Sequence, residues 1–315
     1  MKKILVTGVA GFIGSNMVEL LLKNSDYEII GIDNFQSGRK NEKFLKNLLE
    51  NDRFKFFECA FQDVGSFLNE GIEIVYHFAA TPRVLYSVEH PIETNENNVS
   101  NTLLLLNWCI INKVKRFVFS SSSSVYGNAQ IFPTPETHNL NPVSPYALQK
   151  KIIEEYCKMY SNLYGLDTVC LRYFNVYGPN QYAENAYATV ICSWIKALIK
   201  NSPIRIDGDG SQSRDFSYVT DVCNANFLVG ERKDKFNGEC FNVACNDSTN
   251  LLQIKSILAS LFNKEIDVLK KETRIGDVFK TQADISKIMK IGFSPSVNIK
   301  EGIAKTFNWY ADKCI

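Results

Sequence analysis

The feature that most constrains the fold of this chain is a regular alternation of short apolar segments with amphipathic ones over its first 173 residues. The apolar segments are short and rich in β-branched or aromatic side chains, which is typical of buried strands; they are residues 3–7, 28–32, 55–58, 73–78, 116–120 and 168–173. Helical spacing of apolar residues marks 13–23, 98–112 and 146–164. This alternation predicts a doubly wound parallel sheet with helices on both faces, an α/β fold.

The pattern changes after Gly178, where glycine and proline become frequent and the elements become shorter and more mixed. We therefore expect a first domain over 1–177 and a smaller, mixed α/β domain over 178–315. The strand-like segment Glu239–Val243 is expected to return to the first sheet, within a returning stretch near 215–245.

Charge and cysteine content exclude several classes of function. The chain has 35 Lys+Arg and 34 Asp+Glu, a net charge of +1, so neither nucleic acid nor an anionic membrane is expected as a partner. No apolar run is long enough to span a membrane, and the N-terminal segment lacks the features of a signal peptide. Nine cysteines, an odd number without a C-x-x-C motif, indicate reduced thiols and no metal site. These features predict a cytoplasmic protein that acts on a small molecule.

A dinucleotide site is indicated at the first strand. Gly8, Gly11 and Gly14 follow this strand and open the first helix, where glycines permit a tight turn and a close approach to a pyrophosphate. Asp33 ends the second strand, and a carboxylate there accepts hydrogen bonds from ribose hydroxyls and repels a 2′-phosphate. NAD is therefore favoured over NADP, although Arg39 lies close enough in sequence to meet a phosphate.

A second pattern points to chemistry on a hydroxyl group. Tyr146 and Lys150 are four residues apart and so share one helix face. A nearby ammonium and a positive nicotinamide ring would both stabilise a phenolate. The serine run Ser120–Ser124 ends the fifth strand, at the edge where ligands bind in parallel sheets.

On these residues the chain resembles the extended short-chain dehydrogenase/reductases, in the branch of NAD-dependent nucleotide-sugar epimerases and dehydratases. The resemblance spans essentially the whole chain, and its further motifs are His77–Ala80, Ser120–Gly127, Ser144–Lys150, Arg172–Gly178 and Arg214–Asp215. It implies a Rossmann-type NAD-binding domain followed by a substrate domain, and a homodimer built on the helices at 98–112 and 146–164.

The resemblance also implies site residues. It makes Ser122 the catalytic hydroxyl, Tyr146 the catalytic base, and Lys150 the residue that binds the nicotinamide ribose and tunes Tyr146. The cofactor-binding set would be Gly8, Gly11, Phe12, Ile13, Gly14, Asp33, Asn34, Ser37, Gly38, Ala60, Phe61, Phe78, Ala79, Ala80, Asn98, Ser120, Tyr146, Lys150 and Tyr173. The substrate-binding set would be Ser122, Ser123, Ser124, Asn175, Arg214, Arg274, Asp277 and Thr281.

One position departs from the family pattern. Ala60 stands where the family usually has an aspartate that binds the adenine amino group. The following Phe61 can still contribute backbone and packing contacts, so we expect an adenine end that is held more weakly or differently, without a change in the preference set by Asp33.

The motif at Ser123–Ser124 favours one reaction over another. Dehydratases of this branch carry an Asp-Glu pair there, and related decarboxylases carry Glu at the second position. Without such an acid and base, the groups that would transfer protons during elimination are missing. The resemblance therefore implies a 4-epimerase that inverts C4 of a UDP-hexose through a transient 4-keto sugar.

Thr281 suggests the substrate. It matches a position where a bulky Tyr in relatives limits the sugar to plain hexoses, so a small Thr would admit a C2 N-acetyl group, as in UDP-GlcNAc and UDP-GalNAc. Alternatively, Thr281 only packs and a neighbouring loop fills the space. A strict UDP-glucose epimerase and a UDP-glucuronate epimerase, with Arg83 meeting the carboxylate, are the alternatives among enzymes. A catalytically silent NAD-binding regulator is the alternative outside them.

Overall fold

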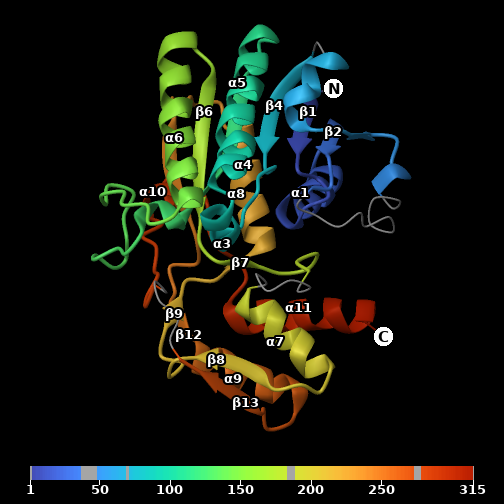
Figure 1. Ribbon diagram of the computed structural model, residues 1–315. Coiled ribbons are helices and arrows are strands. Elements are labelled where there is room, and N and C mark those ends of the chain that lie inside the picture. The colour runs from blue at the N-terminus through green and yellow to red at the C-terminus, as the bar shows by residue number, and fades with distance from the viewer. Residues whose placement is uncertain (1, 37–47, 69–70, 183–188, 273–277, 315) are drawn as a thin grey trace. The chain divides into compact units, whose positions relative to one another are not determined.

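The computed structural model describes residues 2–36, 48–68, 71–182, 189–272 and 278–314. Its main element is a seven-stranded sheet in the order β11-β6-β5-β4-β1-β2-β3, in which the pairs β1–β2, β1–β4, β2–β3 and β4–β5 are parallel (Figure 1). The strands are β1 Lys3–Thr7, β2 Glu28–Asp33, β3 Phe54–Glu58, β4 Ile72–His77, β5 Arg116–Ser122, β6 Asp167–Tyr173 and β11 Glu239–Val243. The predicted doubly wound α/β fold is confirmed, including the return of Glu239–Val243 to the sheet.

The strand order reverses between β1 and β4, and this reversal positions the site. In an open parallel sheet, ligands bind at the carboxyl ends of the strands where the order reverses. Gly8 directly follows β1, Phe78 directly follows β4, and Ser122 is the last residue of β5, so all three lie at this edge.

The helices of the sheet-forming part follow the predicted spacing closely, with one difference. The helix predicted over 98–112 begins with a single π-helical turn, η2, and only its remainder is α-helical. A π turn carries one extra residue and re-aims the side chains within it, here Asn98. The helical elements of this part are α1 Phe12–Asn24, η1 Phe61–Ser66, α3 Val84–Glu89, α4 Pro91–Asn95, η2 Glu96–Ser100, α5 Asn101–Ile111, η3 Ser123–Tyr126, α6 Pro145–Tyr164 and α8 Val219–Glu231.

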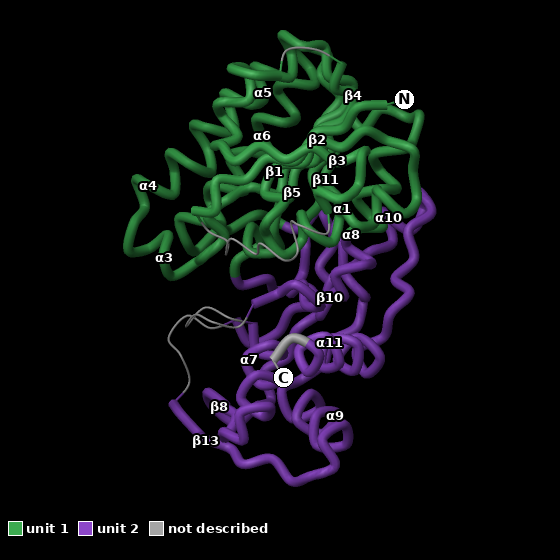
Figure 2. The backbone as a smooth tube through the Cα atoms, turned by 90° about the vertical axis from the view of Figure 1, so that its right-hand side faces the viewer, with its two compact units in different colours: residues 1–127, 139–172, 223–241 green, residues 128–138, 173–222, 242–315 purple. Residues whose placement is uncertain are grey.

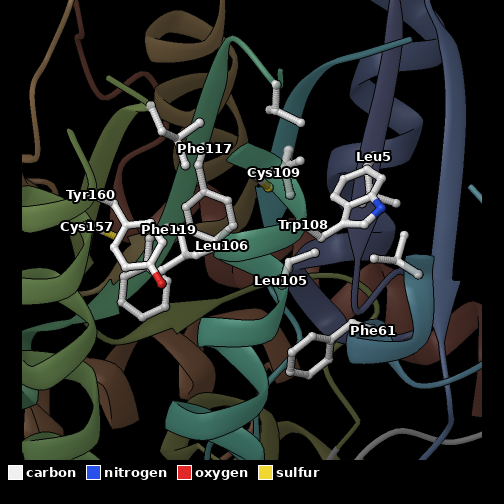
Figure 3. Packing of buried hydrophobic residues seen from close by; sticks show 14 of the residues in the cluster. Leu5, Phe61, Leu105, Leu106, Trp108, Cys109, Phe117, Phe119, Cys157 and Tyr160 are labelled. Carbon is white, nitrogen blue, oxygen red and sulfur yellow. The ribbon is translucent and has the colours of Figure 1, made fainter. Parts of the chain in front are cut away.

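A large apolar cluster holds α5 and α6 against the sheet (Figure 3). Leu105 and Leu106 of α5 and Cys157 of α6 pack with Phe117 and Phe119 of β5, and all five are at most 1% exposed. Burial of each large apolar side chain is worth about 1.5–3 kcal/mol. The base of the candidate active site is therefore a close-packed layer.

The chain divides into two compact units (Figure 2). The first unit contains residues 1–127, 139–172 and 223–241, and the second contains 128–138, 173–222 and 242–315. Among its described residues, the second unit has three two-stranded sheets, β7 with β10, β8 with β13 and β9 with β12. Its elements are β7 Val176–Tyr177, α7 Val190–Ile199, β8 Ile204–Asp207, β9 Ser213–Arg214, β10 Ser217–Tyr218, β12 Thr249–Asn250, α9 Leu251–Phe262, β13 Val268–Lys271, α10 Ser286–Met289 and α11 Ile299–Cys314.

Within the described ranges, every helix is too short or too polar to cross a bilayer.

Candidate active site

The turn between β1 and α1 brings the backbone of two strands very close together. Gly8 has a φ of +75°, and a Cβ there would lie 2.7 Å from the backbone nitrogen of Ala79. A Cβ on Gly14 would lie 2.1 Å from the carbonyl oxygen of Gly8. Helix α1 begins after Gly11 without a side-chain cap, so its first N–H groups remain available to an anion.

Asp33 lies at the carboxyl end of β2 and is fastened to this turn. Its carboxylate accepts a hydrogen bond from the Ala10 N–H at 2.9 Å and one from the Phe35 N–H at 2.8 Å. Burial raises the pKa of Asp33 and these backbone donors lower it, with burial the larger effect. Asn34, the next residue, is exposed and closes a turn by accepting from the Gln36 N–H at 3.1 Å.

The opposite side of the turn is supported by a buried histidine at the end of β4. The His77 ring is 2.7 Å from the Thr7 hydroxyl and 3.1 Å from that of Thr102, and the Ala79 N–H donates to the Thr7 hydroxyl at 3.2 Å. Burial lowers the pKa of His77 to about 3, so the ring is neutral at physiological pH. It therefore orients the segment Phe78–Ala80 without adding charge.

The segment after β3 shows how the adenine end is built. Ala60 precedes η1, and the Cys59 N–H donates to the carbonyl oxygen of Asp33 at 3.1 Å. The Phe61 ring is 5% exposed and lies edge-on to His77, with ring centroids 4.8 Å apart (Figure 3 labels Phe61 in this layer). Because the Phe61 side chain belongs to the core, this position can offer a ligand only its backbone.

The serine run continues β5 into η3. Ser122 caps η3 by accepting from the Ser124 N–H at 3.2 Å, and its side chain is hydrogen-bonded to Tyr146. The Ser124 hydroxyl oxygen is buried and has no hydrogen-bond partner among the described residues. An unsatisfied buried hydroxyl costs free energy, so a ligand group that bonds to it would be favoured.

Tyr146 lies in the first turn of α6, which Ser144 caps by accepting from the Ala147 N–H at 3.2 Å. The N–H of Tyr146 donates to the Ser87 hydroxyl of α3 at 3.0 Å. Desolvation raises the pKa of Tyr146 to about 12, and the hydrogen bond with Ser122 opposes this rise. The phenol is therefore protonated at neutral pH in the protein without ligands.

Lys150 lies one turn further along α6 and is 5% exposed. Its ammonium donates to the carbonyl oxygen of Ser120 at 2.6 Å and lies 5.8 Å from the centre of the Tyr146 ring. Desolvation lowers the pKa of Lys150 to about 8, although the charge of Glu154 raises it. Ser122, Tyr146 and Lys150 thus gather at one place in the first unit.

Both the oxygen and the nitrogen of the Asn98 side-chain amide are hydrogen-bonded to other residues of the protein. Its oxygen accepts from the Thr81 N–H at 2.7 Å, and its amide nitrogen donates to the Thr81 carbonyl oxygen at 3.2 Å and to Gln149 at 2.8 Å. Asn98 therefore connects the segment after β4 with α6, next to Lys150. Tyr173 ends β6 and is 7% exposed.

In the second unit, three of the predicted substrate residues converge. The Asn175 amide donates at 3.1 Å to the Thr281 hydroxyl, which also accepts from the Asp215 N–H at 3.1 Å. Arg214 lies next to Asp215 in the chain and donates to the Ser213 carbonyl oxygen at 3.0 Å. Ser37, Gly38, Arg274 and Asp277, which the sequence also predicts as ligand-binding residues, lie outside the described residues.

Asp215 is the residue that orders this part of the second unit. It is fully buried, and its two carboxylate oxygens accept from the Cys245 N–H and the Ala283 N–H, each at 3.0 Å. Desolvation raises its pKa to about 7 despite these bonds. It thereby fixes the segment that carries Thr281.

Comparison with known proteins decides the family. The model of the NAD-dependent epimerase/dehydratase family matches residues 4–244. The chain belongs to this family. A putative UDP-glucose 4-epimerase of Methanocaldococcus jannaschii is 36% identical over 308 residues, which is 97% of each chain.

Solved structures of family members superpose over nearly the whole chain. A UDP-N-acetylglucosamine 4-epimerase of Methanobrevibacter ruminantium, in complex with UDP-N-acetylmuramic acid, gives a TM-score of 0.93 at 36% identity and 99% coverage of both chains. A UDP-glucuronic acid 4-epimerase of Bacillus cereus, in complex with UDP-glucuronic acid and NAD, gives 0.92 at 33% identity and 99% coverage of both. The chain is an NAD-dependent nucleotide-sugar epimerase, an isomerase of the extended short-chain dehydrogenase/reductase type.

The first unit of this epimerase fits NAD. Gly8 and Gly14 form a cradle in which a Cβ has no room, and the uncapped start of α1 together with Asp33 provides donors for a pyrophosphate and acceptors for a ribose. Across the described residues, no group of three or more His, Cys, Asp or Glu could hold a metal ion, and each cysteine whose side chain is described is a free thiol.

Several residues with a part in this site were not among the predicted site residues. Thr81 and Gln149 bond to Asn98, and the Asp215 N–H donates to Thr281. Glu154 and Arg172 bond to each other, and the charge of Glu154 raises the pKa of Lys150. For Glu154 a signal was present, because it follows Lys150 by four residues and so lies on the same helix face.

Proposed function

We propose that this epimerase inverts C4 of a UDP-hexose and that its sugar pocket admits a C2 N-acetyl group, so that it interconverts UDP-GlcNAc and UDP-GalNAc. The first unit would hold NAD, and the second would hold the nucleotide diphosphate through Asn175, Arg214 and Arg274, with Asp277 on the nucleotide ribose. The observation that carries the N-acetyl preference is Thr281, a small side chain whose hydroxyl is already occupied by Asn175 and Asp215.

Within this proposal, the proton is handled by Tyr146. Bound NAD supplies reversible hydride acceptance and a positive ring charge. With a pKa near 12, formation of the Tyr146 phenolate at pH 7 costs about 7 kcal/mol in the free protein. The hydrogen bond with Ser122 lowers this cost, and the Lys150 ammonium, 5.8 Å from the centre of the Tyr146 ring, would lower it further by attracting the phenolate. Tyr146 Oη then takes the proton of the sugar 4-hydroxyl and later returns it.

The residues at Ser123 and Ser124 support epimerisation rather than elimination. Neither side chain is a carboxylate, so an acid and a base for the expulsion of a hydroxyl group are missing from η3. The buried Ser124 hydroxyl, without a partner among the described residues, is instead suited to a hydrogen bond with the sugar.

The test is a substrate panel with purified protein. Conversion of UDP-GlcNAc to UDP-GalNAc is expected, with UDP-glucose turned over as well. Turnover of UDP-glucose alone would contradict the wide pocket and favour a strict UDP-glucose epimerase. Turnover of UDP-glucuronate alone would favour the Arg83 alternative.

Replacement of Tyr146 by Phe separates an enzyme from a silent NAD-binding protein. The Tyr146→Phe variant should lose at least about 100-fold in kcat, because it lacks the group that moves the proton, and should bind NAD as tightly as the parent. Product analysis and fluorescence titration of NAD give the two measurements. A parent that binds NAD without turning over any UDP-, GDP- or dTDP-sugar would favour the regulator.

We also propose that the enzyme is cytoplasmic and forms a homodimer through α5 and α6. The support for the dimer is the exposure of large apolar side chains on these helices, including Ile111 at 77%, Leu163 at 66% and Tyr164 at 56%.

A further inference from the structure

A buried ion pair lies one helical turn from the proposed catalytic residue Lys150. Glu154 follows Lys150 by one helical turn of α6 and binds Arg172 of β6 through both oxygens, at 2.9 Å to Nε and 2.7 Å to Nη2. The two side chains are 3% and 5% exposed. Because desolvation offsets most of the attraction in a buried pair, stability alone does not account for it.

The pair also holds the segment that carries the catalytic serine. The Ser121 hydroxyl donates to Glu154 Oε1 at 2.5 Å, and Arg172 Nη1 donates to Tyr126 Oη at 2.9 Å. Ser121 immediately precedes Ser122, and Tyr126 is the last residue of η3. The ion pair therefore fastens the segment Ser121–Tyr126 at both ends.

The same pair sets the charge around Lys150. Burial disfavours the Lys150 ammonium, and the Glu154 carboxylate one turn away favours it. Arg172, bound to that carboxylate, moderates its effect. Lys150 thus depends on the balance of two fixed charges.

We propose that Glu154 and Arg172 are positioning residues of the epimerase: together they hold the segment Ser121–Tyr126 in place, and their opposite charges set the charge balance around Lys150, which Glu154 favours in its charged form and Arg172 opposes. This proposal rests on the roles assigned above to Ser122, Tyr146 and Lys150. Neither Glu154 nor Arg172 needs to touch the substrate.

The first unit contains a matched control. Arg116 and Asp167 form a second buried pair, with Arg116 Nη2 and Asp167 Oδ2 2.6 Å apart and side chains 9% and 4% exposed. The Arg116 guanidinium binds the carbonyl oxygens of Val229, Arg232 and Asp234 around the end of α8. Among the described residues, this pair touches none of those proposed for catalysis or binding.

The experiment compares Glu154→Gln, Arg172→Met and Asp167→Asn. Glu154→Gln removes the negative charge near Lys150 and keeps the positive charge of Arg172, so the alkaline limb of the pH profile of kcat should move to lower pH by about one unit. Arg172→Met leaves the carboxylate unpaired and should move the limb to higher pH. Both should lower kcat about tenfold or more through loss of alignment, whereas Asp167→Asn should lose stability and keep the kcat profile of the parent.

Hydrogen exchange provides a readout that does not depend on activity. In the free protein, backbone amides of Ser121–Tyr126 should exchange faster in Glu154→Gln and Arg172→Met than in the parent or Asp167→Asn. The double variant Glu154→Gln/Arg172→Met removes both charges, so its pH limb should return toward that of the parent while exchange stays fast. If a charged-pair variant does not fold, Ser121→Ala and Tyr126→Phe each remove one bond and should also speed the exchange.

The outcomes separate the two proposals. If Glu154→Gln and Arg172→Met behave like Asp167→Asn in both measurements, the positioning role is wrong and the epimerase function stands. If the parent turns over no nucleotide sugar but exchange in Ser121–Tyr126 responds as expected, the proposed function fails and the fastening of the segment stands.

Discussion

At the scale of the residue, two glycines with nearly the same positive φ allow a direct test of the nucleotide cradle. Gly8 and Gly165 have φ values of +75° and +73°, but a Cβ at Gly165 would meet no atom within 4 Å. Gly165→Ala should therefore cost only the left-handed backbone conformation, about 1–2 kcal/mol. Gly8→Ala adds a clash with the Ala79 backbone, and should cost more in urea unfolding and weaken NAD binding at least about tenfold.

Both variants carry the cost of a positive φ, so the difference between them reports the clash with the Ala79 backbone. If both variants bind NAD like the parent, Gly8 is not part of the cofactor site. If both lose stability equally, the close approach to Ala79 does not constrain the turn.

The sequence predicts a site residue when its position is set by nearby residues in the chain, and misses it when its partners are distant. The glycines and Asp33 are recognisable because each position is fixed by the strand it follows. The partnership of Glu154 with Arg172 was not predictable, because it forms only when α6 packs on β6. The role of the Asp215 carboxylate was hidden for the same reason, since its partners lie 30 and 68 residues away.

At the scale of the element, the N-terminus of α6 carries both stability and catalysis. Ser144 caps this helix two residues before Tyr146. Ser144→Ala should lower the free energy of unfolding by about 1 kcal/mol and, because the first turn then frays, should lower kcat about three- to tenfold. Thermal unfolding and steady-state kinetics measure the two effects.

A cap elsewhere provides the control. Asn298 accepts from the Glu301 N–H at 3.0 Å at the start of α11, a helix that carries no proposed site residue. Asn298→Ala should cost a similar amount of stability and leave kcat unchanged. An equal loss of kcat in both variants would show that the cap of α6 has no effect on catalysis beyond its effect on stability.

The strands and helices were predicted well where the spacing of apolar residues was clear. All strands of the main sheet lie within two residues of their predicted positions, because parallel strands buried on both faces appear as short apolar runs. The π turn at Glu96–Ser100 was not predicted, since it leaves the apolar spacing intact and depends on the bonds of Asn98 to Thr81 and Gln149. Its place beside the site agrees with the frequent occurrence of π turns at functional positions.

At the scale of the whole molecule, each unit contains a buried group whose pKa shift makes the free energy of unfolding depend on pH below neutrality: His77 in the first unit and Asp215 in the second. Folding lowers the pKa of His77 to about 3, so its stabilising contribution is complete above pH 6.5 and is lost as the pH falls toward 3. Folding raises the pKa of Asp215 to about 7, so its contribution is complete below pH 3.8 and is lost as the pH rises through 7. Between about pH 4 and 6.5 the two slopes oppose each other.

This opposition predicts variants with opposite pH dependence. Relative to the parent, the free energy of unfolding of His77→Gln should fall with rising pH, by up to about 1.4 kcal/mol per unit between pH 4.5 and 6.5, because only the Asp215 slope remains. Asp215→Asn should show the reverse slope, and the double variant should again follow the parent. Urea unfolding at several pH values, followed by circular dichroism, measures each slope. Parallel curves for the parent and His77→Gln would mean that His77 is not held neutral, and its support of the turn at Gly8 would then need another explanation.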